Sequence, residues 1–520
     1  MDFDVVTLSR WQFGLTAFFH FIYVPLTIGL GFLIAILKTL YLKTKNKTYD
    51  DLSMFFMKLF AINFAAGVAT GLTMEFEFGT NWSEYSKFVG DIFGAPLALE
   101  GLTAFFLEST FMGIFLFGRG RVSDKVHTLS AWMVAIGGTL SALWILIANS
   151  WQQTPAGYKI VETPQGYKAV LTNFWEAVIN HSSVYRFLHT VDGAFITAGF
   201  FVMGVLAFYL IKRRNVEFAK IGLKVAIVFT VIVSAVQIIL GDLHGYEVAH
   251  HQPLKLAMVE GKFESEKCAS LDLFGIIDQE HKQSRMIIKI PCLLSFLSYH
   301  DFNAEVKGID DVIKEYQQKA KEYQQMIPVL EQKLAQAKDE KEKEEIASKL
   351  AEAKVKAHAY NISYADLPSI PLVFTTFHLM VYLGFYFVLI ALVALWKLKR
   401  GTLFNSKGFL WLLVLSIPLP YMANLLGWLS AEIGRQPWIV HGMLLTRDGV
   451  SPVPVHQVLI SLSIFTTLYI IMFVIFLYIM FRTIGKGPKL SEPEAQTTNP
   501  PVEPNPQYST AFSKINKEVK

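Results

Sequence analysis

Nine apolar runs dominate this chain, and each is long enough to cross the hydrocarbon core of a bilayer as a helix. They lie at about residues 15–41, 53–77, 93–118, 127–149, 185–210, 219–241, 370–396, 408–430 and 457–481. Hydrophobic residues make up 52% of the chain and charged residues only 17%, whereas soluble domains carry about 25% charged residues. The runs therefore predict an all-α polytopic membrane protein with about nine transmembrane helices.

Basic residues follow every second run. The clusters after the first, third, fifth, seventh and ninth runs are Lys38 to Lys47, Arg119 to Lys125, Lys212 to Lys220, Lys397 to Lys407, and Arg482 to Lys489. In a chain of nine spans all five clusters fall on one side, and Lys and Arg mark the cytoplasmic side. We therefore expect the N-terminus outside and the C-terminus in the cytoplasm.

The segment between the sixth and seventh runs is unusually long for a connection, and long connections commonly carry function. Its later part, about 304–358, is rich in Glu, Lys, Gln and Ala, which favours helix, and Pro328 interrupts it. We expect a hairpin of two solvated helices that break at this proline. The predicted division is residues 1–245 for helices 1–6, 246–369 for an extracytoplasmic loop, 370–482 for helices 7–9, and 483–520 for a disordered cytoplasmic tail.

Two carboxylates lie inside the third run, in the stretch GAPLALEGLTAFFLEST. An ionisable side chain at bilayer depth costs roughly 2.5–3.5 kcal/mol and points to a functional site. Glu100 and Glu108 are eight positions apart, and at about 100° per residue their side chains lie roughly 80° apart on a helix. Both side chains can therefore face the same interior of the helix bundle. The alternative is a buried pair held only by neighbouring side chains.

Two histidines and a methionine lie in the outer halves of other runs. His20 and His189 are potential haem or metal ligands, although a single such histidine more often bonds two helices together. Met380 alone would be core filler. At the outer end of the eighth run, AEIGRQPW contains Glu432 and Arg435, and the alternative for this turn is an interfacial anchor. Taken together, these residues favour the binding of redox cofactors over a purely structural role for each of them.

Five segments carry a specific pattern. They are LTAFFHFIYVPLTIG, GAPLALEGLTAFFLEST, FLHTVDG, GYE followed by KLAMVE, and GWLSAEIGRQPW. In these segments the chain resembles subunit I of the cytochrome bd-type quinol oxidases, and the resemblance extends from Ser9 to about the end of the ninth run.

The resemblance implies three haems near the outer face. They would be a low-spin haem b, a high-spin haem b, and either haem d or a further haem b. His189 and Met380 would be the axial ligands of the low-spin haem, which receives electrons from quinol. His20 and Glu432 would ligate the two high-spin haems, where O2 is reduced.

The resemblance also implies roles for the other polar residues. Glu100 would lie beside or ligate a high-spin haem, and Arg435 would pair with haem propionates. Glu108 would lead protons up from the cytoplasm. Lys255 and Glu260, in the outer loop, would form the quinol site, where an amine can hydrogen-bond a quinol oxygen and a carboxylate can accept a proton. Weaker candidates for the proton route are Ser141 and Asn149.

One residue departs from the family pattern. His378 lies two positions before Met380, where better-known members of the family carry arginine. A neutral or part-time cation then replaces a permanent one, which should lower the potential of the low-spin haem. Two residues on a helix point about 200° apart, so His378 cannot simply replace Met380 as a ligand.

Composition sets further limits. The net charge of +4 arises largely in short loops and gives no indication of nucleic acid binding. Only Cys268 and Cys292 occur, which excludes a disulfide framework or a cysteine-based metal cluster. Both cysteines lie in the outer loop, where a disulfide is permitted, and the sequence leaves their pairing open.

We therefore expect the haem-bearing catalytic subunit of a quinol:oxygen oxidoreductase in the bacterial cytoplasmic membrane, which generates a proton motive force without pumping. Its partners would be membrane lipid, a second large membrane subunit (subunit II) and, in some assemblies, a small single-span subunit. Two other classes remain. A proton or cation transporter would show inverted repeats and broken helices, and a non-catalytic haem-anchoring or quinol-sensing protein would need one haem.

Overall fold

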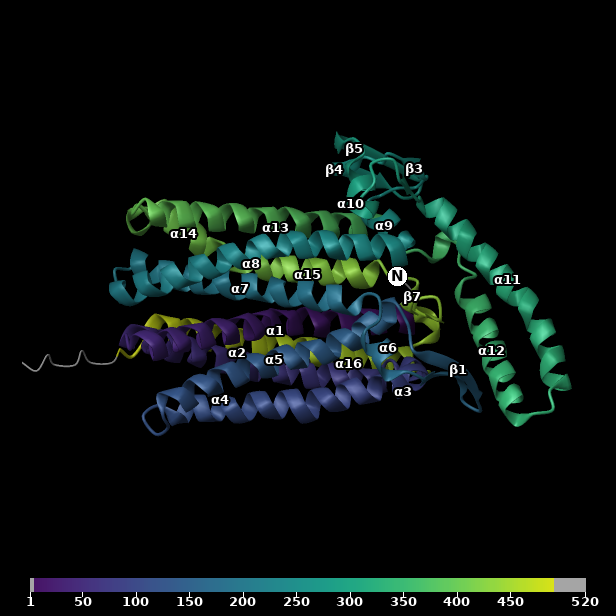
Figure 1. Cartoon of the computed structure of the whole chain (residues 1–520), viewed down its shortest axis with the longest axis horizontal. Helices are drawn as coiled ribbons and strands as arrows, with labels where there is room; N and C mark the ends of the chain where they lie inside the picture. Colours follow the sequence, from purple (N-terminus) through teal and green to yellow (C-terminus); the bar gives the residue numbers. More distant parts are fainter. Residues whose placement is uncertain (1–3, 491–520) are drawn as a thin grey trace, which may run out of the picture.

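The structure is a computed structural model that describes residues 4–490, except for the side chains of residues 286 and 287. Within this part, nine helical segments are long and apolar enough to cross a membrane, which confirms the predicted all-α polytopic class. They form one elongated bundle (Figure 1). Their bounds are α1 Val5–Thr44, α2 Lys47–Thr80, α3 Ser83–Leu99 continued by a π turn Glu100–Phe105 and α4 Phe106–Gly118, α5 Asp124–Gln153, α7 Ser183–Ile211, α8 Val216–His251, α13 Ile370–Lys399, α14 Lys407–Leu415 continued by α15 Pro418–Ile433, and α16 Val455–Lys486.

Most helices run beyond the apolar runs that predicted them. α1 begins at Val5, where the Asp4 side chain accepts a hydrogen bond from the Thr7 backbone N–H at 2.8 Å. A helix continues until a side chain or turn satisfies its terminal backbone groups, whereas an apolar run marks only the part that avoids water. At the other end of the chain, α16 extends to Lys486, and most of the predicted disordered tail, 483–520, lies outside the described residues.

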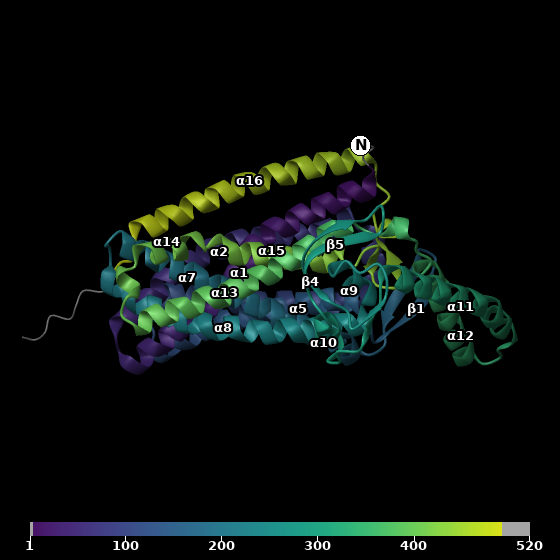
Figure 2. The same cartoon turned by 90° about the horizontal axis from the view of Figure 1, so that it is seen from above.

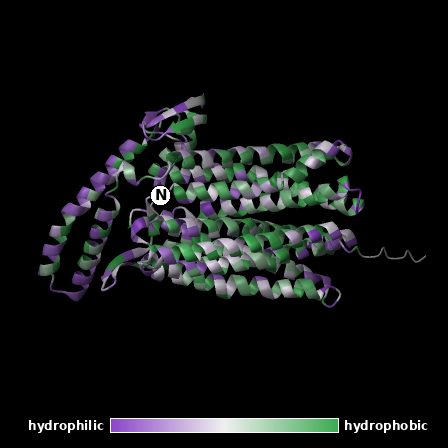
Figure 3. Cartoon of the chain, turned by 180° about the vertical axis from the view of Figure 1, so that it is seen from behind, coloured by the Kyte–Doolittle hydropathy of each residue, from purple (hydrophilic) through white to green (hydrophobic). Residues whose placement is uncertain are grey.

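The basic clusters gather at one end of the bundle. Lys45, just after α1, pairs with Asp124 at the start of α5, with 2.7 Å between Nζ and Oδ2. Arg214, between α7 and α8, donates to the Gly485 carbonyl of α16 at 2.9 Å. The long segment between α8 and α13 lies at the opposite end, and Figure 3 shows its hydrophilic helices beside the hydrophobic bundle. We call that opposite end the loop end.

The helices in the bundle centre approach closely through glycines. Gly29 of α1 lies directly against the Ala194 backbone of α7, where an added Cβ would overlap the Ala194 carbonyl oxygen. Gly199 of α7 lies equally close to Thr230 of α8. Small residues let helices without a hydrophobic driving force pack by van der Waals contact. α1, α7 and α8 therefore form a rigid centre.

The last helix stands at the edge of the bundle. α16 packs against α1 and α2, where Tyr469, Phe476 and Met480 are buried (Figure 2). Its remaining surface is apolar and exposed, with side chains such as Ile464 and Val474 more than half exposed. That surface must contact lipid or another subunit.

Short elements build the connections. They are β1 Tyr158–Thr163, β2 Gly166–Leu171, α6 Phe174–Val178, α9 Pro253–Val259, β3 Glu266–Lys267, β4 Leu271–Asp278, β5 Gln283–Ile290, α10 Leu293–Tyr299, β6 Glu305–Val306, α11 Ile309–Gln336, α12 Glu340–Ala359, β7 Trp438–Val440, β8 Leu444–Leu445, and 3-10 turns at Tyr364–Asp366, Leu403–Asn405 and Thr446–Asp448. The strands pair as four antiparallel two-stranded sheets, β1–β2, β3–β6, β4–β5 and β7–β8. A disulfide joins Cys268 and Cys292 at the base of the β4–β5 hairpin, which resolves the pairing that the sequence left open.

α11 and α12 form an antiparallel pair that leans away from the bundle (Figure 1). The expectation that Pro328 separates them is wrong, because Pro328 lies inside α11. The chain instead turns after Gln336, and the Asp339 side chain caps α12 by accepting from the Glu342 backbone N–H. A side-chain cap satisfies the free backbone N–H groups at the start of a helix and so favours a new helix at that point. The single backbone N–H that Pro328 lacks does not end α11.

The close approach of α1 and α7 gives a stability prediction. Gly29→Ala should destabilise the protein by about 1–3 kcal/mol, because the added methyl forces two packed helices apart. Gly113→Ala on α4 is the matched control, since nothing lies within 4 Å of its added Cβ. There alanine should be neutral or stabilising by up to about 1 kcal/mol, through its better helix propensity. Thermal unfolding of both variants in one detergent measures the difference, and equal melting temperatures would contradict the packing described.

Candidate functional site

A cavity of about 1490 Å³ lies in the loop-end half of the bundle, bounded by the first half of α1 and α7 and the last half of α8. Its walls are mainly apolar side chains from α1, α5, α7, α8, α13 and α15. Eight residues singled out from the sequence line it, namely His20, Asn149, His189, Lys255, Glu260, Met380, Glu432 and Arg435. Glu100 and Glu108 do not line it.

His20 lies at the α1 wall of the cavity. Its Nδ1 is 2.9 Å from the Thr70 hydroxyl oxygen of α2, which fixes the ring. Gly71 lies beside the ring, and an added Cβ there would be 3.2 Å from Cε1. His20 lines the cavity, and an imidazole in that position can serve as a metal ligand.

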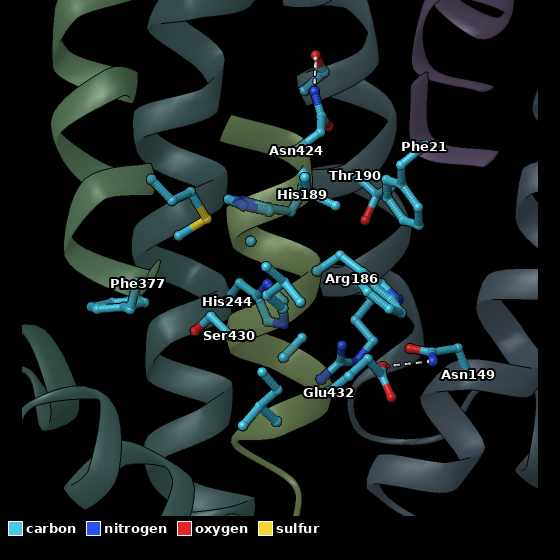
Figure 4. A pocket seen from close by; sticks show the side chains of 18 of the residues that line it. Phe21, Asn149, Arg186, His189, Thr190, His244, Phe377, Asn424, Ser430 and Glu432 are labelled. Carbon is cyan, nitrogen blue, oxygen red and sulfur yellow. Dashed lines mark hydrogen bonds between the residues drawn. The ribbon is translucent and has the colours of Figure 1, made fainter. Parts of the chain in front are cut away.

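His189 and Met380 reach the same cavity from α7 and α13. His189 lies near Gln237 of α8, whose Nε2 is 3.2 Å from the His189 carbonyl oxygen. Met380 packs against α15 at Gly427, where an added Cβ would be 2.7 Å from Sδ. Figure 4 shows His189 and His244 pointing into the same space, and their ring centroids are 5.3 Å apart.

Glu432 and Arg435 form a buried ion pair at the mouth of the cavity. Arg435 Nη2 is 2.5 Å from Glu432 Oε2, and Asn149 donates to Oε1 at 2.8 Å (Figure 4). The other two guanidinium nitrogens of Arg435, Nε and Nη1, have no hydrogen-bond partner among the described residues, and neither does Nε of the nearby Arg186. Both arginines are 5% exposed. Buried cationic donors without partners are costly, so this part of the cavity fits anionic groups.

Glu100 opens the π turn between α3 and α4. Its Oε1 accepts a hydrogen bond from the Ser141 hydroxyl of α5 at 2.7 Å. π turns occur frequently at functional sites. The sequence argument assumed an uninterrupted α-helix between Glu100 and Glu108, and that assumption is wrong.

Glu108 is 4% exposed and lies against two glycines of α5. An added Cβ on Gly137 would be 2.9 Å from the Glu108 backbone nitrogen, and one on Gly138 would be 3.1 Å from its Oε1. That oxygen has no hydrogen-bond partner among the described residues. Both carboxylates of the third span therefore face α5, as the two-glutamate pattern predicts, although the angle between them is not that of an α-helix.

Lys255 and Glu260 border the cavity from α9 and its C-terminal end. Burial holds the pKa of the Lys255 ammonium well below its usual range, and its Nζ donates to the side-chain oxygens of Gln153 and Gln252. Burial raises the pKa of the Glu260 carboxyl to about 8, although the positive charge of Lys262 opposes that shift. Desolvation thus favours the neutral form of both groups. A buried lysine and a buried carboxyl that both tend towards the neutral form suit acid–base chemistry.

His378 contacts the long loop. Its Nε2 is 3.0 Å from the Asp272 carbonyl oxygen of β4, and its Nδ1 is 2.9 Å from the Phe374 carbonyl oxygen. A carbonyl only accepts, so both contacts are hydrogen bonds only when both ring nitrogens carry hydrogen, that is, in the imidazolium form. His378 therefore fastens the β4–β5 hairpin to α13.

Several residues at the site were missed from the sequence. Arg186 and His244 line the cavity, and Gly137 and Gly138 make room for Glu108. An arginine three positions before a candidate histidine ligand, in YRFLH, and a Gly-Gly pair inside an apolar run are signals that were available. Nothing in the sequence alone shows that these residues meet Glu432 and Glu108.

Comparison with known proteins identifies the family. Residues 8–488 match the family described as cytochrome bd terminal oxidase subunit I. The chain is 38% identical over 512 residues to the cytochrome bd-II ubiquinol oxidase subunit 1 of Escherichia coli (strain K12), covering 95% of this chain and 99% of that one. It is 37% identical over 485 residues to the cytochrome bd ubiquinol oxidase subunit 1 of Bacillus subtilis (strain 168), covering 93% and 94%.

A solved structure is also similar. The bd oxidase from Geobacillus thermodenitrificans matches with a TM-score of 0.78 and 27% identity, covering 94% of this chain and 99% of that chain. The chain therefore belongs to the cytochrome bd terminal oxidase subunit I family, and it is a membrane-embedded subunit of a terminal oxidase.

Proposed function

We propose that this chain is the haem-bearing catalytic subunit of a quinol oxidase in the bacterial cytoplasmic membrane, which oxidises quinol at the loop end and reduces O2 to water. One observation carries the proposal. A single cavity joins potential iron ligands, buried arginine nitrogens that have no hydrogen-bond partner among the described residues, and a lysine–carboxyl pair of perturbed proton affinity. The quinol oxidases named among the relatives supply the substrate class.

The residues present fit haem better than a bare metal ion. Among the described residues, no group of three or more His, Cys, Asp or Glu side chains is arranged to hold an ion. His189, Met380 and His20 therefore suit an iron whose other ligands come from a macrocycle. The apolar walls suit such a ring, and the free guanidinium donors of Arg186 and Arg435 suit its propionates.

Assignment to individual haems follows the family resemblance. His189 and Met380 would hold the low-spin haem b, and His20 and Glu432 would hold the two high-spin haems, one of type b and one of type d or b, with Glu100 beside one of them. When bound, these groups would carry electrons from quinol and reduce O2. The chain's own contribution is to orient the ligands, through Thr70 for His20 and through Asn149 and Arg435 for Glu432.

The quinol site would lie at Lys255 and Glu260. The Lys255 amine can hydrogen-bond a quinol oxygen, and the Glu260 carboxylate can accept a quinol proton. Their pKa values are shifted towards neutrality from opposite sides, so neither needs to hold a fixed charge in a buried place. Lys255, Glu260 and Met380 all line the same cavity.

Protons for O2 reduction would come from the other side of the membrane. The basic clusters support a cytoplasmic location for that side. Glu108 lies deeper in the span than Glu100, and both face α5, where Ser141 donates to Glu100. Quinol would release its protons outside, and the protons that reduce O2 to water would be taken from inside. This would generate a voltage across the membrane without pumping.

A second large subunit would cover the α2–α3 face. Glu75 of α2 is exposed in this chain, and Glu100 is partly exposed. The two carboxylates are close enough for the charge of Glu75 to act on Glu100. Carboxylates inside membrane spans rarely face lipid. Another protein must therefore cover this face, which supports a subunit II as partner, while the apolar face of α16 leaves room for a small single-span subunit.

The haem content of the purified enzyme tests the proposal. We expect three haems per copy of this chain and quinol-dependent O2 consumption, whereas a sensor or anchor would hold one haem and a transporter none. Met380→Leu should remove the low-spin haem band from the reduced-minus-oxidised spectrum. Met422→Leu, an exposed methionine of α15 outside the cavity, should leave it intact. An unchanged spectrum in Met380→Leu would refute this ligand assignment.

A second prediction concerns Glu108. In vesicles with intact haems, Glu108→Gln should abolish most of the membrane potential formed during quinol oxidation, because an amide cannot pass on a proton. The potential is followed with a voltage-sensitive dye. Full potential at an equal rate of O2 consumption would remove Glu108 from the route.

A third prediction concerns pH. Glu260 accepts a proton only as a carboxylate, so quinol oxidation should rise as the pH is raised through about 8, the pKa of its carboxyl. Glu260→Gln should lower turnover by on the order of 100-fold and remove that rise. Steady-state rates of both proteins across the pH range provide the measurement. A rise through about pH 8 that persists in Glu260→Gln would assign it to another group.

A further inference from the structure

A buried carboxylate near the end of α8 has no part in the chemistry proposed so far. Glu247 is 2% exposed, and neither of its side-chain oxygens has a hydrogen-bond partner among the described residues. It is not one of the residues that line the cavity, so a molecule bound there does not explain the missing partners. Native proteins leave few buried polar groups unpartnered, because each costs free energy. A carboxyl kept in this state is available to take up and release a proton.

Glu247 lies between the cavity wall and the surface. The titratable and charged groups that face it are Arg186 of α7, Lys255 of α9, His251 of α8 itself, and His181 in the segment before α7. Arg186 and Lys255 line the cavity. His181 and His251 are exposed at the loop end. Within the described part of the chain, no lysine or arginine nitrogen forms an ion pair with Glu247, so no fixed cation holds its charge in place.

Two histidine rings connect Glu247 to water. His251 Nδ1 is 3.5 Å from Glu247 Oε1, and the His251 side chain is 35% exposed. Its ring stacks on that of His181, with 4.3 Å between the centroids. Imidazole takes up and releases protons readily near neutral pH. Two side chains therefore span the distance from a buried carboxyl to the outer solvent.

We propose that Glu247, His251 and His181 form an exit path for a proton released by quinol at the outer face. This inference rests on the proposed function, which requires such a path. A quinol that becomes a quinone loses two protons and two electrons, and the electrons pass on to O2, the final oxidant. One quinol O–H bond breaks, and its proton moves through a water molecule beside Lys255 to the Glu247 carboxylate. In the tautomer with hydrogen on Nε2, His251 takes that proton on Nδ1, which then donates to the Glu247 backbone carbonyl oxygen 3.2 Å away, and the ring releases its Nε2 proton to water beside His181.

The next residue along the chain provides a matched control. His250 occupies the same helix end, but its ring lies against Tyr246 and Tyr299, with centroids 4.2 and 5.2 Å away. Its Nδ1 is 2.9 Å from the Tyr246 carbonyl oxygen. None of these contacts reaches Glu247. Replacing His250 changes the same charge and surface without touching the proposed path.

The test uses the haem-loaded enzyme in vesicles, with quinol-driven O2 consumption as the readout and the haem spectrum as a check of intactness. We expect Glu247→Gln to lower turnover by on the order of 100-fold, the lower end of the range for a positioned proton acceptor. Glu247→Asp should restore most of the rate. His251→Ala should be slow and should regain activity when free imidazole is added to the outer medium, while His250→Ala should match the parent enzyme with or without imidazole.

Imidazole rescue separates proton transfer from structure, because a merely structural histidine is not replaced by a free base in solution. Wild-type turnover by Glu247→Gln, or a slow His251→Ala that imidazole does not restore, would overturn the exit path. These outcomes differ from failure of the proposed function. A parent enzyme that does not oxidise quinol refutes that function, whereas an active parent with a fully active Glu247→Gln refutes only this inference.

Discussion

The cost of burying charge inside an apolar helix bundle governs this structure. Apolar side chains cost nothing there, but each buried charge needs a partner, a ligand or a chemical role. The centre around Gly29 and Ala194 meets this constraint with small apolar contacts alone. The loop-end half does not, because Arg186, Arg435 and Glu247 keep unpartnered polar atoms there. A further unpartnered oxygen, that of Glu108, lies deeper in the bundle, and together these atoms point to the sites proposed for chemistry.

The same constraint explains how the site is held. Glu432 would be costly where it lies without Asn149 and Arg435, and those two residues come from α5 and from the turn after α15. His20 is held from α2 and Met380 is packed against α15. The candidate ligands are therefore fixed by contacts between helices, and a rigid glycine-packed centre keeps those helices in register. The packing that stabilises the centre of the bundle thus also sets the positions of the candidate ligands at the loop end.

Sequence patterns predicted what depends on local composition. Apolar runs gave the nine spans, and the cost of charge in lipid pointed to Glu100 and Glu108. What depends on contacts between distant segments was not accessible, such as Gly137 and Gly138 beside Glu108 or Arg186 beside Glu432. The β1–β2 and β4–β5 hairpins were missed because the sequence was searched for long apolar helices. Short strands that are stabilised mainly by pairing with each other show only a weak alternation of apolar and polar residues. The prediction that Pro328 separates the two helices was wrong, because the break between helices depends more on a cap, which Asp339 provides, than on one missing hydrogen bond.

The π turn between Glu100 and Glu108 sets the rotation of everything that follows it in the third span. A π turn has the effect of one residue inserted into an α-helix. Winding the same residues as regular α-helix, without a π turn, would add about 100° of rotation and turn α4 by that angle relative to α3. Glu100 would still meet Ser141, but Glu108 would leave the recess at Gly137 and Gly138. The π winding of this six-residue segment thus decides whether both carboxylates face the same neighbouring helix.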